Sequence, residues 1–104
     1  MIKINGSEIK DSVNNGDGVY LQFSATWCGP CKTLKRTVES IEADYKNVSF
    51  YYVDIDECDP EIIKAFGVRS VPVACFFKSG ELTSQKIGSL SQSKIKDELA
   101  VLCM

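Results

Sequence analysis

The segment FSATWCGPCK, Phe23–Lys32, places two cysteines three positions apart at the junction of two predicted elements. The residues Val19–Phe23 before the junction are typical of a strand, and Pro30 is typical of the first turn of a helix. Cys28 would then lie at a helix N-terminus, where unpaired N–H groups and the positive end of the helix dipole stabilise a thiolate. Because the thiolate is the attacking species in thiol–disulfide exchange, Cys28 is a predicted nucleophile.

Cys31, one helical turn further on, is predicted to resolve the mixed disulfide that attack by Cys28 would form. Gly29 keeps side-chain bulk away from an approaching substrate, while Pro30 removes a backbone donor and stiffens the loop. Trp27 is expected to shield the rim of the site. The segment thus predicts a dithiol–disulfide couple open to other molecules.

A purely structural role for Cys28 and Cys31 would be a stabilising bridge or a zinc site. The chain-entropy model gives only about 2 kcal/mol for a bridge that closes so short a loop. A structural zinc site needs four ligands, and the sequence has no histidine and no second Cys-x-x-Cys motif. We therefore favour redox chemistry and expect no metal.

The composition is that of one globular domain, residues 1–104, large enough to build its own core. Its 12 Lys and Arg residues and 14 Asp and Glu residues are scattered, which argues against nucleic acid and membranes as partners. The N-terminal sequence MIKINGSEIK lacks the apolar segment of a secretory signal. We expect a cytoplasmic protein, in which a structural disulfide framework among the five cysteines is not expected.

The remaining sequence alternates between strand and helix patterns. Segments rich in β-branched and aromatic residues, and an alternating N-terminal edge segment, are the predicted strands: Met1–Ile4, Val19–Phe23, Val48–Asp54, Val73–Lys78 and Thr83–Gly88. Segments with apolar residues at three- and four-residue spacing, or with capping residues, are the predicted helices: Pro30–Tyr45, Asp59–Gly67 and Ser91–Leu102.

The predicted fold is α/β with the order β-α-β-α-β-α-β-β-α, whose first helix, between the first two strands, is given no bounds. The early crossovers require parallel strands, and the turn sequence KSGE, Lys78–Glu81, predicts a late antiparallel hairpin. A mixed central sheet with helices on both faces follows.

WCGPCK after a strand closely resembles the thioredoxin family, and the likeness extends over essentially the whole chain. RSVPVACFFKSGE, Arg69–Glu81, looks like the family's loop with a cis-proline, here Pro72, and its hairpin. IGSL, Ile87–Leu90, matches the glycine before its last helix. The resemblance implies the thioredoxin fold, protein-disulfide reductase activity and a part in cell redox homeostasis. It also implies no bound cofactor, with electrons reaching the Cys28–Cys31 disulfide from NADPH through a flavoprotein thioredoxin reductase.

The resemblance further implies a shallow substrate groove formed by Trp27, Val71 with Pro72, and Gly88. A cis bond before Pro72 agrees with the small cis penalty of X-Pro bonds, and the Val71 backbone could then pair with an extended substrate. The alternative is that Pro72 starts an edge strand in the trans form.

The sequence departs from the family pattern at two modulating positions. Most thioredoxins carry a buried aspartate six residues before the first cysteine and a lysine on the third strand, where Gln22 and Tyr52 stand here. A glutamine cannot accept a proton as a carboxylate does, so resolution by Cys31 would rely on water or another acid. Lys32 is a further modulating candidate, and Arg36, in place of a helix-kinking proline, predicts a straighter helix.

The other three thiols are assigned no catalytic role. Cys58 is predicted to be exposed and only mildly reactive, because its acidic neighbours should raise its pKa. Cys75 is predicted to fill the core, and Cys103 lies near the C-terminus. We expect a monomer that could form an oxidative dimer through Cys58 or Cys103.

Three functions are compatible with these residues. The first is a protein-disulfide reductase, the second a redox-dependent binding module with weak turnover, and the third a disulfide isomerase or oxidant. The spacing of Cys28 and Cys31 alone does not set the reduction potential that separates the first from the third.

Overall fold

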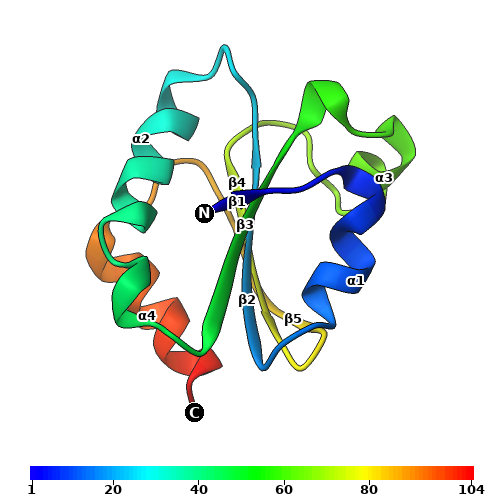
Figure 1. The fold of residues 1–104 in the computed structure, drawn as a ribbon. Coiled ribbons are helices and arrows are strands. Elements are labelled where there is room, and N and C mark those ends of the chain that lie inside the picture. The colour runs from blue at the N-terminus through cyan, green and yellow to red at the C-terminus, as the bar shows by residue number, and fades with distance from the viewer.

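A five-stranded mixed sheet forms the centre of the computed structural model, which describes residues 1–104 (Figure 1). Its strands lie in the spatial order β1-β3-β2-β4-β5. The strand bounds are β1 Ile2–Lys3, β2 Gly18–Ser24, β3 Val48–Asp54, β4 Val73–Lys78 and β5 Glu81–Ile87. Strands β1, β3 and β2 are parallel, whereas β4 pairs antiparallel with both β2 and β5. The predicted mixed sheet and the predicted order of elements along the chain are confirmed.

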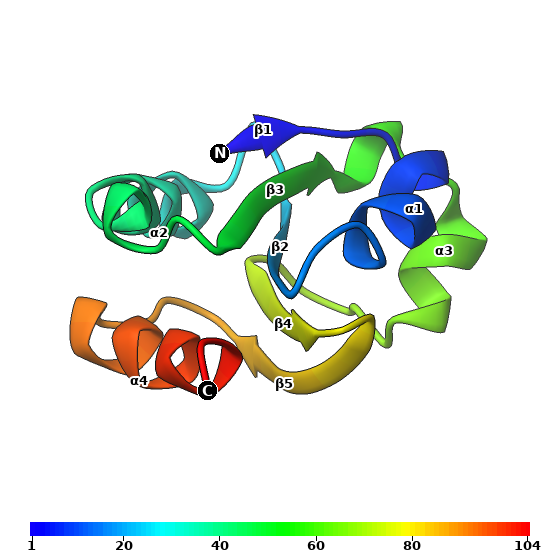
Figure 2. The same ribbon diagram turned by 60° about the horizontal axis from the view of Figure 1, so that its bottom comes forward.

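Helices cover both faces of this sheet (Figures 1 and 2). One face carries α1, Ile9–Val13, and α3, Pro60–Ala65. The other carries α2, Gly29–Glu39, and α4, Gln92–Leu102. None of these helices combines the length and the apolar character needed to cross a membrane.

Strand β2 separates two hydrophobic cores, which is why its sequence is a nearly continuous apolar run. Val19, Leu21 and Phe23 enter the core on the α1 and α3 side. Tyr20 enters the core on the α2 and α4 side. Alternate side chains of one strand point to opposite faces, so both cores are attached to the strand that leads into Cys28.

The predicted end of the long helix is wrong. Helix α2 passes Arg36 without a break but ends at Glu39, and a 3-10 turn, Glu42–Asp44, follows it. The Ser40 hydroxyl donates to the Thr37 carbonyl at 2.6 Å at this end. Ile41 leaves helical geometry and is still only 3% exposed, so the apolar periodicity continues where the helix does not.

The predicted capping and turn residues are confirmed. Asp59 caps α3 by accepting the Glu61 N–H at 2.9 Å, and Ser91 caps α4 by accepting the Lys94 N–H at 3.1 Å. At the hairpin between β4 and β5, the turn residue Gly80 has a φ of 84°, a conformation that glycine adopts without strain.

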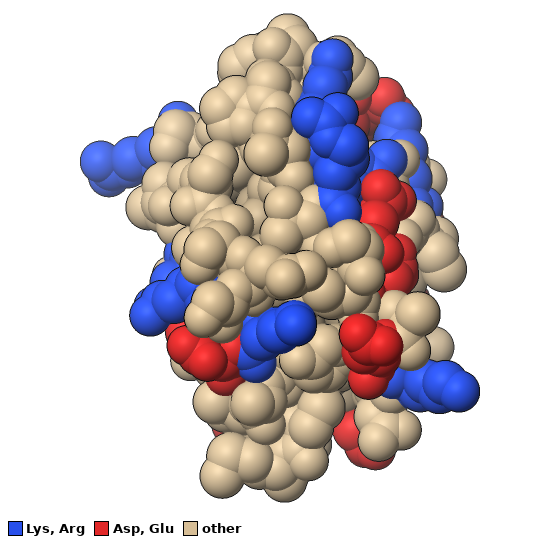
Figure 3. Space-filling view, turned by 90° about the vertical axis from the view of Figure 1, so that its left-hand side faces the viewer, with Lys and Arg blue, Asp and Glu red and all other residues tan.

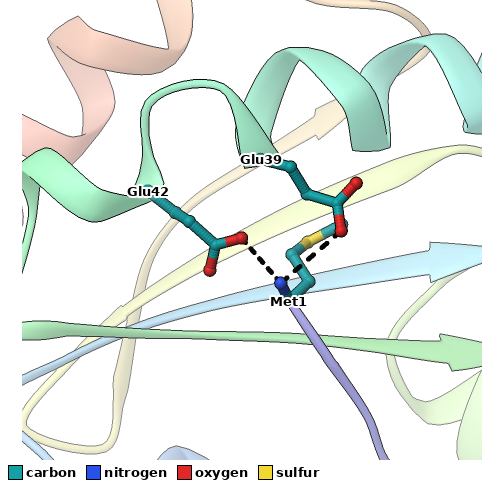
Figure 4. Close-up of polar contacts among 3 residues, drawn as sticks. All are labelled: Met1, Glu39 and Glu42. Atoms are coloured by element: carbon teal, nitrogen blue, oxygen red, sulfur yellow. Dashed lines mark hydrogen bonds and ion pairs between the residues drawn. The ribbon is translucent and has the colours of Figure 1, made fainter.

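Ion pairs connect the N-terminal amine, just before β1, to the end of α2 and the 3-10 turn that follows it (Figure 4). The Met1 amine donates to Glu42 Oε1 at 2.7 Å and lies 3.7 Å from Glu39 Oε2. These contacts reinforce an edge strand that pairs with β3 through only two residues, Ile2 and Lys3.

Candidate active site

Cys28 lies where β2 gives way to α2, and it is the N-cap residue of that helix. It forms a disulfide with Cys31, and its sulfur accepts the Cys31 backbone N–H at 3.1 Å. The same sulfur lies 3.8 Å from the Val71 carbonyl oxygen. A helix N-terminus thus points a donor at the Cys28 sulfur, as the sequence predicts, and this contact favours a thiolate over a thiol.

Little of the disulfide is exposed. Cys28 is 5% exposed and Cys31 2% exposed, and both pack with Ala25. Gly29 and Pro30 are exposed beside them, and a Cβ built at Gly29 would meet no atom within 4 Å. The glycine therefore leaves open space at the position from which a substrate sulfur would approach.

Trp27 stands over the rim with 67% of its surface exposed. Its indole N–H donates to Asp56 Oδ2 at 2.9 Å, which fixes the ring through a residue that follows β3. Asp56 could not be identified as a site residue from the sequence, because its role depends on a contact between positions 29 apart in the chain.

The cis bond between Val71 and Pro72 is confirmed. Gly88 has a φ of 86° and donates its N–H to the Pro72 carbonyl at 2.8 Å, so Gly88 lies beside the Val71–Pro72 loop. Val71 is half-buried, lies outside the helices and strands, and makes no backbone hydrogen bond in a turn or loop. Its N–H and C=O groups are available to an extended chain.

Ile87 is a groove candidate that the sequence analysis missed. It is 72% exposed, pairs with Val73 across the β4–β5 ladder and precedes Gly88. Ile87 and Trp27 are two of the large apolar side chains that remain exposed in this chain. The available signal in the sequence was its position, because Ile87 directly precedes the predicted groove residue Gly88.

Gln22 is completely buried and fully hydrogen-bonded beneath α2. Its Oε1 accepts the Tyr20 hydroxyl at 2.8 Å, and its Nε2 donates to Ser24 Oγ at 2.7 Å and to the Cys31 carbonyl at 3.1 Å. Burial raises the pKa of Tyr20 far above its ordinary value of 10. The side chains next to the Cys31 backbone therefore form a neutral network.

Tyr52, the second modulating position, is not a buried partner of Gln22. The two residues are register neighbours on β3 and β2, but Tyr52 is only half-buried. Its ring instead lies under the Lys35 ammonium, 4.4 Å from the ring centroid. The buried partner of Gln22 is Tyr20, which lies two positions before it on the same face of β2.

Basic side chains follow one another along α2. The first turn of this helix contains no acidic residue, Lys32 and Lys35 come next, and Arg36 lies in the last turn. Figure 3, which views the face formed by α2 and α4, shows a column of basic side chains descending from the end that carries the β2–α2 connection. Lys32 and Lys35 line the same pocket as Cys31, so positive charge lies on the Cys31 side of the disulfide.

The prediction that Cys58 is exposed is wrong. It is 8% exposed, and its sulfur packs so closely against Gly6 that a Cβ added there would overlap it. Its pKa is raised, as predicted, but burial is the main cause and the Asp59 charge the lesser one. Cys58 is therefore not available for an intermolecular disulfide in the folded chain.

The other two free thiols, Cys75 and Cys103, differ in burial. Cys75 is completely buried in β4, and burial raises its pKa to about 12, which confirms it as a core residue. Cys103 is exposed just beyond the end of α4. Of the three free cysteines, Cys103 alone can meet a second chain without unfolding.

Replacing Cys103 with serine is expected to eliminate the covalent dimer formed on treatment with hydrogen peroxide, because no other free thiol is exposed. Non-reducing gel electrophoresis measures the dimer, with Cys58→Ser as the matched comparison. A dimer that persists in Cys103→Ser and disappears in Cys58→Ser would contradict the burial of Cys58.

The variant Gln22→Asp is expected to add an ionisation to the pH–rate profile. A carboxylate at this fully buried position has its pKa raised by desolvation, by as much as 3–5 units in fully buried sites. The profile of insulin reduction between about pH 5 and 9 tests this, with Gln22→Asn as the neutral comparison. Identical profiles for the wild type and Gln22→Asp would refute a role for charge here.

The family model described as Thioredoxin matches residues 1–101. A thioredoxin of Mycoplasmoides gallisepticum is 33% identical over 95 residues, which cover 91% of this chain and 94% of that protein. The structure of a mutant thioredoxin from Halobacterium salinarum NRC-1 matches with a TM-score of 0.88 and 30% identity, covering 99% of this chain and 90% of that one.

A further similar structure, from a study of how a yeast mitochondrial 1-Cys peroxiredoxin is resolved through the glutathione and thioredoxin systems, has a TM-score of 0.86 and 27% identity. It covers 97% of this chain and 94% of that one. Because a thioredoxin model spans nearly the whole chain and the Cys28–Cys31 disulfide lies at the start of α2, this chain belongs to the thioredoxin family and is a protein-disulfide oxidoreductase.

Proposed function

We propose that Cys28 is the nucleophile and Cys31 the resolving cysteine of a disulfide-reduction cycle. The observation that carries this assignment is the Cys28 sulfur at the α2 N-cap, 3.1 Å from the Cys31 N–H. The Cys28 thiolate attacks a substrate disulfide, forming a new S–S bond as one substrate sulfur leaves and takes a proton. The Cys31 sulfur, on losing its proton, then attacks Cys28 and releases the second substrate thiol.

The substrate chain lies in the groove between Trp27, the Val71–Pro72 loop and Gly88. The unpaired backbone groups of Val71 support β-type pairing with an extended segment. Ile87 supplies apolar contact area beside this segment. Gly29 and Pro30 leave the Cys28 side of the disulfide open, so a substrate sulfur approaches Cys28 rather than Cys31.

The electrons come from NADPH through a flavoprotein thioredoxin reductase, and the chain itself binds no cofactor. We place this cycle in the cytoplasm, where protein thiols are held reduced, and assign it a part in electron transport and cell redox homeostasis. The support is the family membership together with a disulfide that a protein partner can reach at its rim.

A coupled assay tests the proposed cycle. The purified chain is mixed with NADPH, a thioredoxin reductase and insulin, and the oxidation of NADPH is followed. We expect consumption to depend on the chain, on the reductase and on the insulin disulfides.

A parallel assay replaces the reductase and NADPH with dithiothreitol. Insulin reduction in the dithiothreitol assay alone would support the reductase activity but reject the proposed electron donor. No acceleration in either assay would favour a redox-dependent binding module.

A further inference from the structure

A cavity of about 300 Å³ adjoins Cys31 under the first turns of α2. Its walls come from the ends of β2 and β3, the β2–α2 connection, α2 and β1. The lining residues are Lys3, Ser24, Ala25, Thr26, Cys31, Lys32, Lys35, Tyr52 and Asp54. A space of this size, into which a carboxylate, hydroxyl groups and ammonium groups project from partly apolar walls, can hold water molecules.

Asp54 is the carboxylate in this cavity, and it is only 8% exposed. Apart from aromatic Tyr20, Asp54 and Gln22 are the buried polar residues of this chain. Asp54 pairs in register with Ser24, and Tyr52 with Gln22, across the parallel strands β3 and β2. Register neighbours share a face, so Asp54 lies on the same side of the sheet as Gln22, under α2.

The two buried polar residues beside Cys31 differ in what they can do with a proton. Gln22 is a neutral amide that takes up no proton near neutral pH; its oxygen accepts from Tyr20, and its two amide hydrogens go to Ser24 and the Cys31 carbonyl. Asp54 Oδ1 accepts the Asp56 N–H at 2.9 Å, and its Oδ2 makes no hydrogen bond within the protein. One oxygen of a buried carboxylate is therefore free at the cavity.

We propose that Asp54 receives, through water in the cavity, the proton that Cys31 loses when it attacks the mixed disulfide. The Cys31 S–H bond breaks, its electron pair forms the bond to the Cys28 sulfur, and the Cys28–substrate bond breaks. The substrate leaves as a thiolate, and the proton from Cys31 ends on Asp54 until solvent removes it. This inference rests on the proposed resolving role of Cys31.

Three ammonium groups line the cavity together with Asp54. Lys32 and Lys35 approach from α2, and Lys3 approaches from β1. Three other ionisable groups lie near these cations: Tyr52 beneath Lys35, Asp56 two residues after Asp54, and Glu57, which pairs with Lys3 at 3.0 Å.

The variant Asp54→Asn tests the proposal, because an asparagine oxygen still accepts the Asp56 N–H while the side chain no longer takes a proton. The reduced chain, in excess and in a Cys103→Ser background, is mixed with the symmetric disulfide of thionitrobenzoate. Attack by Cys28 releases one coloured thiolate at a rate that depends on protein concentration. Resolution by Cys31 releases the second coloured thiolate at a rate that is independent of protein concentration.

At neutral pH we expect the second phase of Asp54→Asn to be slower by about tenfold or more, and the first phase to stay within about twofold of the wild type. The difference should disappear above about pH 9, where hydroxide removes the thiol proton directly. The convergence distinguishes proton transfer from damage to the fold, which would slow the variant at every pH.

The matched control is Asp59→Asn. Asp59 also accepts an N–H two residues further on at 2.9 Å, but it lies outside the cavity. In Asp59→Asn the rates of both phases should match those of the wild type. An unchanged second phase in Asp54→Asn, a loss that is equal at all pH values, or an equal loss in Asp59→Asn would overturn the proposal. Absence of the first phase in the wild type would instead reject Cys28 as nucleophile, and the inference with it.

Discussion

Replacing Cys28 with serine is expected to reduce insulin disulfide reduction to the uncatalysed rate, a loss of about a thousandfold or more. A serine hydroxyl does not ionise near neutral pH and cannot form the S–S bond that exchange requires. Replacing Cys31 with serine should act differently, because Cys28 still attacks but nothing resolves the product. The Cys31→Ser chain should therefore accumulate as a covalent adduct with its substrate.

Insulin precipitation in the presence of dithiothreitol measures the loss of insulin reduction in Cys28→Ser. Intact-protein mass spectrometry without reductant measures the covalent adduct of Cys31→Ser. Cys103→Ser is the control, since this exposed thiol lies outside the site and its loss should leave both readings unchanged. Substantial turnover by Cys28→Ser, or an adduct on Cys28→Ser rather than on Cys31→Ser, would contradict the assignment.

The substitution Phe76→Ala is expected to lower the free energy of unfolding by about 3–5 kcal/mol. Phe76 is completely buried in β4 and lies opposite Tyr20 in the β2–β4 ladder. The two rings pack edge-on, with their centroids 5.3 Å apart. The alanine leaves a cavity that the sheet and the covering helices cannot close. Stability of a domain is typically about 5–15 kcal/mol, so the variant should be near the limit of folding.

Urea denaturation of the oxidised chain, followed by circular dichroism, measures this loss. Leu82→Ala on β5 is the control, because Leu82 is 48% exposed and its removal should change stability by only about 0.5 kcal/mol. A loss below about 1 kcal/mol for Phe76→Ala would mean that Phe76 is not tightly packed.

The sequence was most informative where one local rule governs the structure. The strand Val48–Asp54 and the caps Asp59 and Ser91 follow from side-chain chemistry within a few residues, and the structure confirms them. Cys28 and Cys31 were identified in the same way, because a strand, a helix start and the cysteine spacing coincide.

Contacts between distant segments could not be predicted in this way. The acidic neighbours of Cys58 suggested a surface position, but its sulfur packs against Gly6, which is far away in the sequence. The helix boundary at Glu39 was missed because Ile41 keeps the apolar spacing while its backbone leaves the helix. The role of Asp54 depends on the register of β3 against β2, which no single segment encodes.

The position of β2 between the two cores affects how the molecule opens. Its backbone pairs with strands on both sides, and its side chains are shared by both hydrophobic layers. Neither layer can come apart locally while β2 remains intact, so its amide protons should exchange with solvent only when the whole molecule unfolds. The disulfide is thus attached to the part of the protein that opens last, and thiol exchange can proceed without loosening its support.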